Sequence, residues 1–228
     1  MADARTTILE RLTRLVSILG PDNVDKVTLV GGTAPAMFEM AGAPLRMTDD
    51  IDLVLPVQGP LDWYRYVGEM ETRGFRASTA EGAPICRYVH GDLVVDVMPT
   101  DDRLGFTNAW YPEAVRLRQS TPVAGLHVLP PIVFLATKFE AFFTRGLADP
   151  ATSRDLEDIV LVLRGKRQLF DDIASGNEPL HASLRTSFRR LTSMGAAIDY
   201  VVGMVEGDEA SQRAARALFA RMKAIGDT

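Results

Sequence analysis

The sequence contains one cysteine and only three histidines in 228 residues. A single cysteine, Cys86, excludes a disulfide within the chain and a cysteine-based metal cluster. No base is visible beside it in the sequence, so we expect a small buried residue and not a reactive thiol. The three histidines lack the spacing of metal ligands, which argues against a zinc site.

Long apolar runs are also missing. No segment approaches the roughly 18–20 consecutive apolar residues that span a bilayer, so we expect no membrane partner. The first residues carry charges where a signal peptide would need its apolar run, and we therefore expect a cytoplasmic protein. The net charge of −5 argues against sequence-independent coating of nucleic acid, although it leaves room for a local basic groove.

Hydrophobic periodicity divides the chain near residue 130 into two parts. We predict an α+β fold, in which residues 1–130 form a mixed sheet with flanking helices and residues 131–228 form a helical C-terminal bundle. Strands are predicted at 27–30, 51–55, 85–90, 93–98 and 126–129. Helices are predicted at 5–19, 33–40, 60–73, 112–118, 132–145, 154–165, 166–175, 179–193, 196–205 and 208–224.

A short glycine-rich turn follows the first predicted strand, in Gly31-Gly32-Thr33. Glycines let the backbone approach a phosphate closely, and the amides at a helix N-terminus favour an anion. The Thr33 hydroxyl can donate to a terminal phosphate oxygen. A Gly-Gly turn between a strand and a helix is by itself more often only a turn, so this motif needs support from elsewhere.

Three aspartates supply that support. Side chains alternate along a strand, so Asp50 and Asp52 point to one face of the strand at 51–55. Asp96 lies inside the apolar run LVVDVM, where a solvated surface acid is out of place. Magnesium prefers oxygen ligands and usually takes one or two carboxylates together with substrate phosphates. The three carboxylates therefore predict a site for Mg²⁺ (or Mn²⁺).

The order of these motifs resembles the nucleotidyltransferase superfamily of the DNA polymerase beta type, and most of all the AbiEii/AbiGii toxin family with its MenT-like toxins. The resemblance covers about residues 27–165 and implies a nucleotidyltransferase-type sheet in the N-terminal part. It implies nucleotide binding by the turn and the RMTDDID segment, and metal binding by the three aspartates. The residues matched in this part are Gly31, Gly32, Thr33, Arg46, Thr48, Asp50, Asp52 and Asp96.

The family also has a helical lysine followed by an R-D-x-x-D helix, which Lys138 and the segment from Arg154 to Asp158 match. A lysine in such an apolar helix is more often a side chain whose charged end reaches solvent. The resemblance instead implies that Lys138 holds phosphate, and Arg145 on the same helical face extends the basic wall. Asp155 and Asp158 share a face, and either could be the base for the incoming hydroxyl or orient the lysine.

The resulting hypothesis is a nucleotidyltransferase with an NTP substrate. The resemblance implies the 3′ end of a tRNA as acceptor and an antitoxin protein as partner. A small molecule, as in antibiotic nucleotidyltransferases, would be an acceptor for the same chemistry. A nucleotide-binding regulatory protein without turnover is an alternative of another class, and a plain α+β interaction module leaves Asp96 and Lys138 unexplained.

Overall fold

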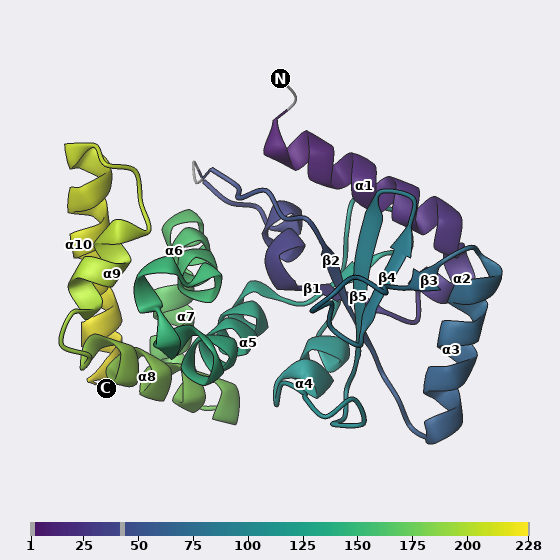
Figure 1. The fold of residues 1–228 in the computed structure, drawn as a ribbon. Helices are drawn as coiled ribbons and strands as arrows, with labels where there is room; N and C mark the ends of the chain where they lie inside the picture. The colour runs from purple at the N-terminus through teal and green to yellow at the C-terminus, as the bar shows by residue number, and fades with distance from the viewer. Residues whose placement is uncertain (1–2, 42–43, 228) are drawn as a thin grey trace. The chain divides into compact units, whose positions relative to one another are not determined.

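The computed structural model describes residues 3–41 and 44–227. The chain divides into two compact units, shown as ribbons in Figure 1. Unit 1 contains Met1–Phe38 and Leu45–Pro130, and unit 2 contains Glu39–Pro44 and Pro131–Thr228. A mixed sheet with flanking helices in unit 1 and helices in unit 2 confirm the α+β prediction. No helix among the described residues is long and apolar enough to cross a membrane.

Unit 1 is built on a mixed sheet with the strand order β3-β4-β5-β2-β1-β7-β6. The strands are β1 (Thr28–Val30), β2 (Ile51–Leu55), β3 (Arg76–Ala77), β4 (Arg87–His90), β5 (Leu93–Pro99), β6 (Gln119–Ser120) and β7 (His127–Val128). The strand β2 pairs antiparallel with β1 and parallel with β5, so it lies inside the sheet. Its apolar residues are buried on both faces, which is typical of a strand covered by helices on either side.

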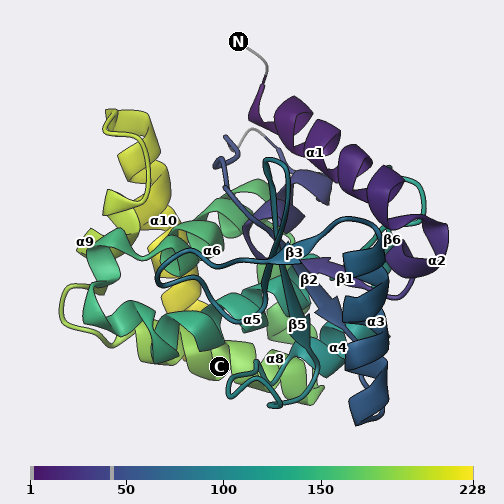
Figure 2. The ribbon, with the colours of Figure 1, turned by 45° about the vertical axis from the view of Figure 1, so that its right-hand side comes forward.

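The helices of unit 1 flank this sheet, and Figure 2 shows α1 and α3 beside it. They are α1 (Ala4–Leu19), α2 (Pro21–Val24), η1 (Gly31–Met37), α3 (Pro60–Thr72) and α4 (Tyr111–Arg116). Helix α1 buries the apolar stripe that predicted it, including Leu12 and Leu15 at zero exposure. Gly20 ends this helix with a φ of +74°, which a glycine adopts without strain.

The prediction of a helix at 33–40 is wrong in type and extent. The segment is a 3-10 helix, η1, that starts at Gly31 and ends at Met37. Pro35 lies inside it and has no N–H to donate to a carbonyl four residues back. The N–H of Phe38 donates to the Pro35 carbonyl at 3.1 Å, which closes the tighter i→i+3 turn. Elements of two to four residues, α2, β3 and β6, were not predicted because they are too short to show a period.

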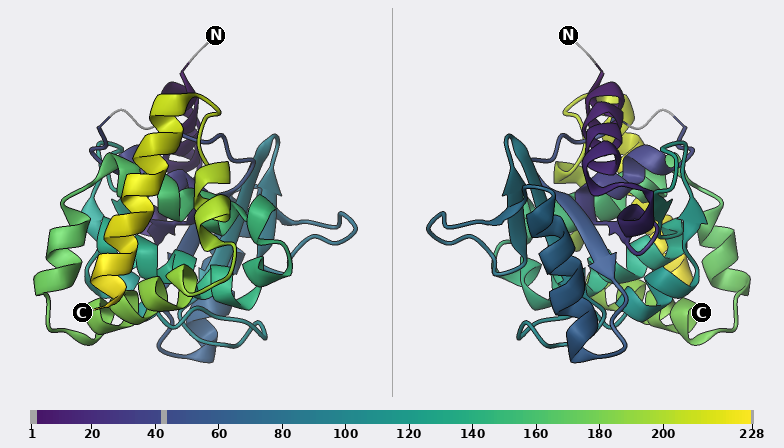
Figure 3. Two further views of the ribbon diagram at one scale, coloured as in Figure 1. Left: turned by 90° about the vertical axis from the view of Figure 1, so that its left-hand side faces the viewer. Right: turned by 90° about the vertical axis from the view of Figure 1, so that its right-hand side faces the viewer.

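Unit 2 contains α5 (Pro131–Thr144), η2 (Gly146–Ala148), η3 (Pro150–Thr152), α6 (Arg154–Gly165), α7 (Leu169–Ser175), α8 (Pro179–Thr192), α9 (Ala197–Gly203) and α10 (Glu209–Gly226). The predicted helices are confirmed, with α7 beginning later than residue 166. Ser153 caps α6 by accepting a hydrogen bond from the Leu156 N–H. Phe139 and Phe170 each contact the Phe188 ring in the core, and Figure 3 shows α10 alongside α8 and α9.

Candidate functional site

Strand register brings the predicted phosphate loop and the predicted carboxylates of unit 1 together. Val30, the last residue before the loop, pairs with Asp52 across the antiparallel β1–β2 ladder. Asp52 in turn lies beside Asp96 in the parallel β2–β5 ladder. Neighbouring strands are about 4.8 Å apart. The loop and the two acids are therefore near neighbours in the sheet, although Gly31 and Asp96 lie 65 positions apart in the sequence (96 − 31 = 65).

The Asp52 carboxylate leaves no room for a side chain at the first glycine of the loop. Gly31 has a φ of +61°, in the left-handed region that favours glycine. A Cβ atom built on Gly31 would lie 1.8 Å from Oδ2 of Asp52, well inside van der Waals contact. The missing side chain thus allows the backbone of the loop to lie directly on the carboxylate.

The second glycine contacts the segment before β2. A Cβ atom on Gly32 would lie 2.7 Å from Cγ2 of Thr48 and 2.8 Å from Nη2 of Arg46. The Thr48 hydroxyl donates to the Asp50 carbonyl at 3.1 Å, and the Arg11 guanidinium donates to the Thr48 carbonyl at 2.5 Å. The Arg11 bond ties the RMTDDID segment to α1, and the close contacts of Gly32 show that the same segment lies against the loop.

Thr33 is almost completely buried at 1% exposure. Its hydroxyl has no hydrogen-bond partner among the residues that the structure describes. Buried polar groups are nearly always satisfied, so an unpaired hydroxyl next to a glycine loop is an uncommon feature. A ligand oxygen would satisfy it, which agrees with the phosphate-binding role predicted for the loop.

The structure adds a residue that the sequence analysis missed, Arg87 on β4. Its Nε and Nη2 donate to the two oxygens of Asp96, both at 2.8 Å. The same Nη2 also donates to Oδ2 of Asp50 at 2.7 Å. Hydrogen bonding to Asp96 raises the pKa of Arg87 further above its usual value, so the guanidinium stays charged. Arg87 therefore neutralises part of the negative charge of the carboxylate pair.

A signal for Arg87 was present in the predicted hairpin. With a two-residue turn at Gly91-Asp92, His90 pairs with Leu93, and counting back along both strands places Arg87 opposite Asp96. The structure has this register. An arginine directly across from a carboxylate in an antiparallel pair forms an ion pair on one face of the sheet.

Asp50 and Asp96 both direct a carboxylate oxygen at Nη2 of Arg87, so a cationic side chain already lies between them. Mg²⁺ usually binds through one or two carboxylates and completes its shell with water and substrate phosphate. No three His, Cys, Asp or Glu side chains form a metal-binding group within residues 3–41 and 44–227. The Asp52 carboxylate lies against Gly31 of the loop, and the Arg87 guanidinium donates hydrogen bonds to Asp50 and Asp96.

Cys86, next to Arg87, is buried as predicted, with 3% exposure. Burial, followed by the nearby Asp96 carboxylate, raises the pKa of its thiol to about 12. The thiol is therefore protonated at neutral pH and is a poor nucleophile.

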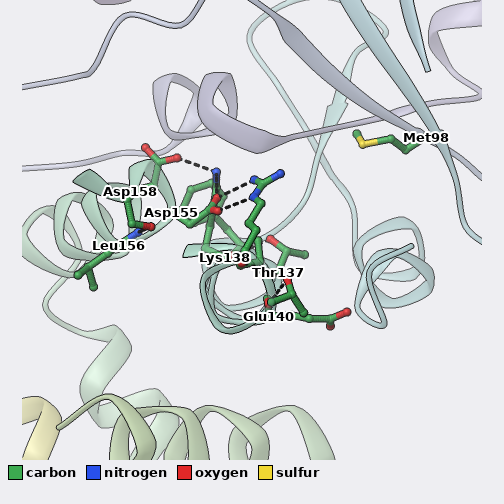
Figure 4. Close-up of polar contacts among 12 residues, drawn as sticks. Met98, Thr137, Lys138, Glu140, Asp155, Leu156 and Asp158 are labelled. Carbon is green, nitrogen blue, oxygen red and sulfur yellow. Dashed lines mark hydrogen bonds and ion pairs between the residues drawn. The ribbon is translucent and has the colours of Figure 1, made fainter. Parts of the chain in front are cut away.

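Unit 2 contains the second set of predicted residues, which the structure brings into one ion-pair network. Nζ of Lys138 lies 2.7 Å from Asp158 and 3.1 Å from Asp155, and Figure 4 shows both carboxylates pointing toward it. Arg145 donates to both oxygens of Asp155, at 2.9 and 3.1 Å. Lys138 is only 8% exposed, so its charged end does not reach out to solvent.

The ionisation of Asp155 follows from this network. Burial is the largest single influence and opposes ionisation, but the contacts with Arg145 and Lys138 together outweigh it. The pKa of Asp155 is accordingly lowered from its ordinary value, and the carboxylate is charged at neutral pH. Two buried carboxylates and two cations balance one another, which is the condition for keeping charges inside a protein.

Comparison with known proteins adds no further assignment. A scan of the sequence against protein-family profiles finds no match, and a search of curated proteins finds no significant relative. Chemically, unit 1 offers a loop with an unpaired hydroxyl beside paired carboxylates, and unit 2 offers a buried lysine held by two acids.

Proposed function

We propose that the protein is a metal-dependent nucleotidyltransferase, which transfers an NMP group from an NTP to an acceptor hydroxyl. The observation that carries this proposal is the contact between Gly31 and Asp52 beside the Asp50–Asp96 pair. A phosphate on the loop would lie next to carboxylates that could hold its counterion. A glycine at left-handed φ, a buried hydroxyl without a partner among the described residues, and clustered acids lie together here and support the proposal.

The residues of this chain take distinct parts in the proposed reaction. The loop amides and the Thr33 hydroxyl bind phosphate oxygens. The acceptor hydroxyl loses its proton to water as its oxygen attacks the α-phosphorus, the bond from that phosphorus to the oxygen of the β-phosphate breaks, and pyrophosphate leaves. Asp50, Asp52 and Asp96 would hold Mg²⁺ or Mn²⁺, which neutralises charge on the phosphates. Asp155 and Asp158 orient Lys138.

The resemblance to the AbiEii/AbiGii toxins supplies the acceptor and the biological setting of the proposal. It favours the 3′ end of a tRNA as acceptor, in the cytoplasm, with an antitoxin protein as partner. An antibiotic-type small molecule would use the same donor chemistry. The acceptor is therefore the part of the proposal that must be tested separately from transfer itself.

A second candidate is a nucleotide-binding regulatory protein without turnover. The observation that favours it is Arg87, whose guanidinium already neutralises Asp50 and Asp96. In that case the phosphate loop would bind nucleotide while the carboxylates serve only to hold the arginine.

Labelling with radioactive NTPs separates the two candidates. The protein is incubated with each α-labelled NTP and Mg²⁺, with total tRNA in one arm and aminoglycosides in another. Transfer that is lost in Asp96→Asn supports the nucleotidyltransferase. Asp101→Asn is the matched control, because Asp101 also pairs with an arginine in unit 1 but lies outside the carboxylate cluster. NTP binding without transfer to any acceptor supports the regulatory protein.

A further inference from the structure

Three arginines line a cavity of about 200 Å³ in unit 2. They are Arg164 in the last turn of α6, Arg167 just after this helix, and Arg221 on α10. The remaining wall is formed by Ala41 and by the α10 residues Ala214, Ala217 and Leu218. None of these lining residues is acidic, so the wall of the cavity carries only positive charge.

The wall around the arginines is firmly held. The Ala41 N–H donates to the Gly165 carbonyl at 3.0 Å, and Nζ of Lys166 donates to the Glu39 carbonyl at 3.0 Å. Gly165 lies so close to Met40 that a Cβ atom on the glycine would be 2.8 Å from the methionine Cβ. These contacts tie the 39–41 segment to the end of α6.

Two of the guanidinium groups are held in place by neighbours. Arg221 stacks on the Phe170 ring, 4.4 Å from its centroid, and its Nη2 lies 3.4 Å from Asp171. Arg164 lies 3.1 Å from Glu206. Both acids are exposed, at 85% and 46% of their side-chain surface, so water weakens their compensation of the arginine charges.

Arg167 has neither a hydrogen bond nor an ion pair through its side chain with any residue of the described ranges 3–41 and 44–227. Its charge therefore adds to the cavity without compensation. Three guanidiniums against two solvent-exposed acids leave an excess of positive charge. Like charges gathered at one cavity repel one another, and a bound anion relieves this repulsion, which solvent already weakens because Arg167 and Arg221 are partly exposed.

We propose that this cavity binds a phosphate group. The planar guanidinium fork matches the geometry of phosphate oxygens, and stacking on Phe170 orients one fork in advance. Cavities that bury whole drug-sized ligands measure about 300–1,000 Å³, so the smaller volume here suits a charged group and not an entire nucleotide. The inference stands independently of the proposed transfer reaction, because it uses none of the residues assigned to it.

The test is an NMR titration of the full-length protein with inorganic phosphate at constant ionic strength. We expect the backbone amides of Gly165, Ala214 and Ala217 to shift, separately from those of the loop at 31–33. Arg167→Ala should weaken the phosphate affinity measured through these amides at least about tenfold, because a hydrogen bond between charged groups contributes about that much to binding. Since this side chain has no partner in the described residues, the substitution should leave the fold intact.

The matched control is Arg216→Ala on the same helix. The cavity residues of α10 recur at helical spacing on one face, and Arg216 lies on the opposite face and is exposed. This variant removes the same charge and should keep wild-type affinity. An equal loss in both variants would reveal unspecific electrostatic attraction and overturn the proposal.

A second arm identifies the source of the phosphate group. It replaces inorganic phosphate by a short single-stranded oligoribonucleotide that has no terminal phosphate. Shifts with inorganic phosphate alone identify a free phosphate or phosphomonoester, and shifts with the oligonucleotide identify a nucleic-acid backbone. If the amides at the cavity respond to neither probe, the site does not bind phosphate.

Discussion

Arg87 offers the most direct perturbation of the carboxylate cluster. Arg87→Ala removes three hydrogen bonds and leaves the Asp96 side chain, which is 9% exposed, without its cation. Breaking a fully buried ion pair by removing one partner costs about 3–5 kcal/mol. Arg87 and Asp50 are 27% and 33% exposed, so solvent lowers the expected loss in unfolding free energy to about 2–3 kcal/mol.

A divalent cation should reverse this loss. With Arg87 gone, Mn²⁺ can take the place of the guanidinium between the carboxylates, and we expect it to bind the variant at least about tenfold more tightly than the wild type. At a concentration one hundred times its dissociation constant, a ligand adds about 2.7 kcal/mol to the unfolding free energy. Urea unfolding with and without Mn²⁺ measures stability, and calorimetric titration measures affinity.

Arg103→Ala is the control for this experiment. Arg103 forms a bidentate pair with Asp101 at 2.7 and 2.6 Å, outside the carboxylate cluster. Its loss should lower stability without creating any dependence on Mn²⁺. The reasoning fails if Mn²⁺ stabilises Arg87→Ala no more than it stabilises Arg103→Ala, because the carboxylates would then have no affinity for a cation of their own.

Three further predictions concern stability. Gly31→Ala should lower the unfolding free energy by about 3 kcal/mol or more, measured in urea, since it combines left-handed φ with a clash against Asp52; an unchanged midpoint would contradict the contact. The pKa of Asp155 is lowered by folding, so its ionised carboxylate stabilises the folded state at pH values above the ordinary pKa of 3.8. This stabilisation is lost as the pH falls through the lowered pKa. The stability gap between wild type and Asp155→Asn should therefore be widest near neutral pH and narrow in acid, and a constant gap argues against the shift. Lys138→Met should cost about 3–5 kcal/mol, because the buried Asp158 carboxylate loses its lysine partner while Asp155 keeps Arg145. Adding Asp158→Asn should recover part of this loss in a double-mutant cycle.

The regular elements were predictable from sequence where burial follows a clear period. The apolar stripe of α1, the short apolar run of β2 and the Ser153 cap of α6 each fix an element through local chemistry. The 3-10 helix η1 could not be predicted from the sequence. Pro35 is tolerated in a first α-helical turn, and the sequence pattern gives no reason to choose the tighter helix.

The sequence singles out the glycines and aspartates of the candidate site, but it does not reveal Arg87 or the contacts among these residues. The glycines and aspartates stand out because Asp96 lies in an apolar run and Gly31 follows a strand. That Arg87 neutralises Asp50 depends on three strands meeting in the sheet, which pairwise spacing along the sequence does not contain. The Arg164–Arg167–Arg221 cavity depends on helix packing in the same way.

The tight turn at Gly91-Asp92 has a consequence for how this gene can change. The register of β4 against β5 is counted from that turn, and Gly91 adopts a φ of +60° within it. Inserting one residue into the turn and keeping β5 in place would move β4 by one position and send Arg87 to the other face of the sheet. The turn should therefore tolerate substitution at Asp92 far better than any change in length.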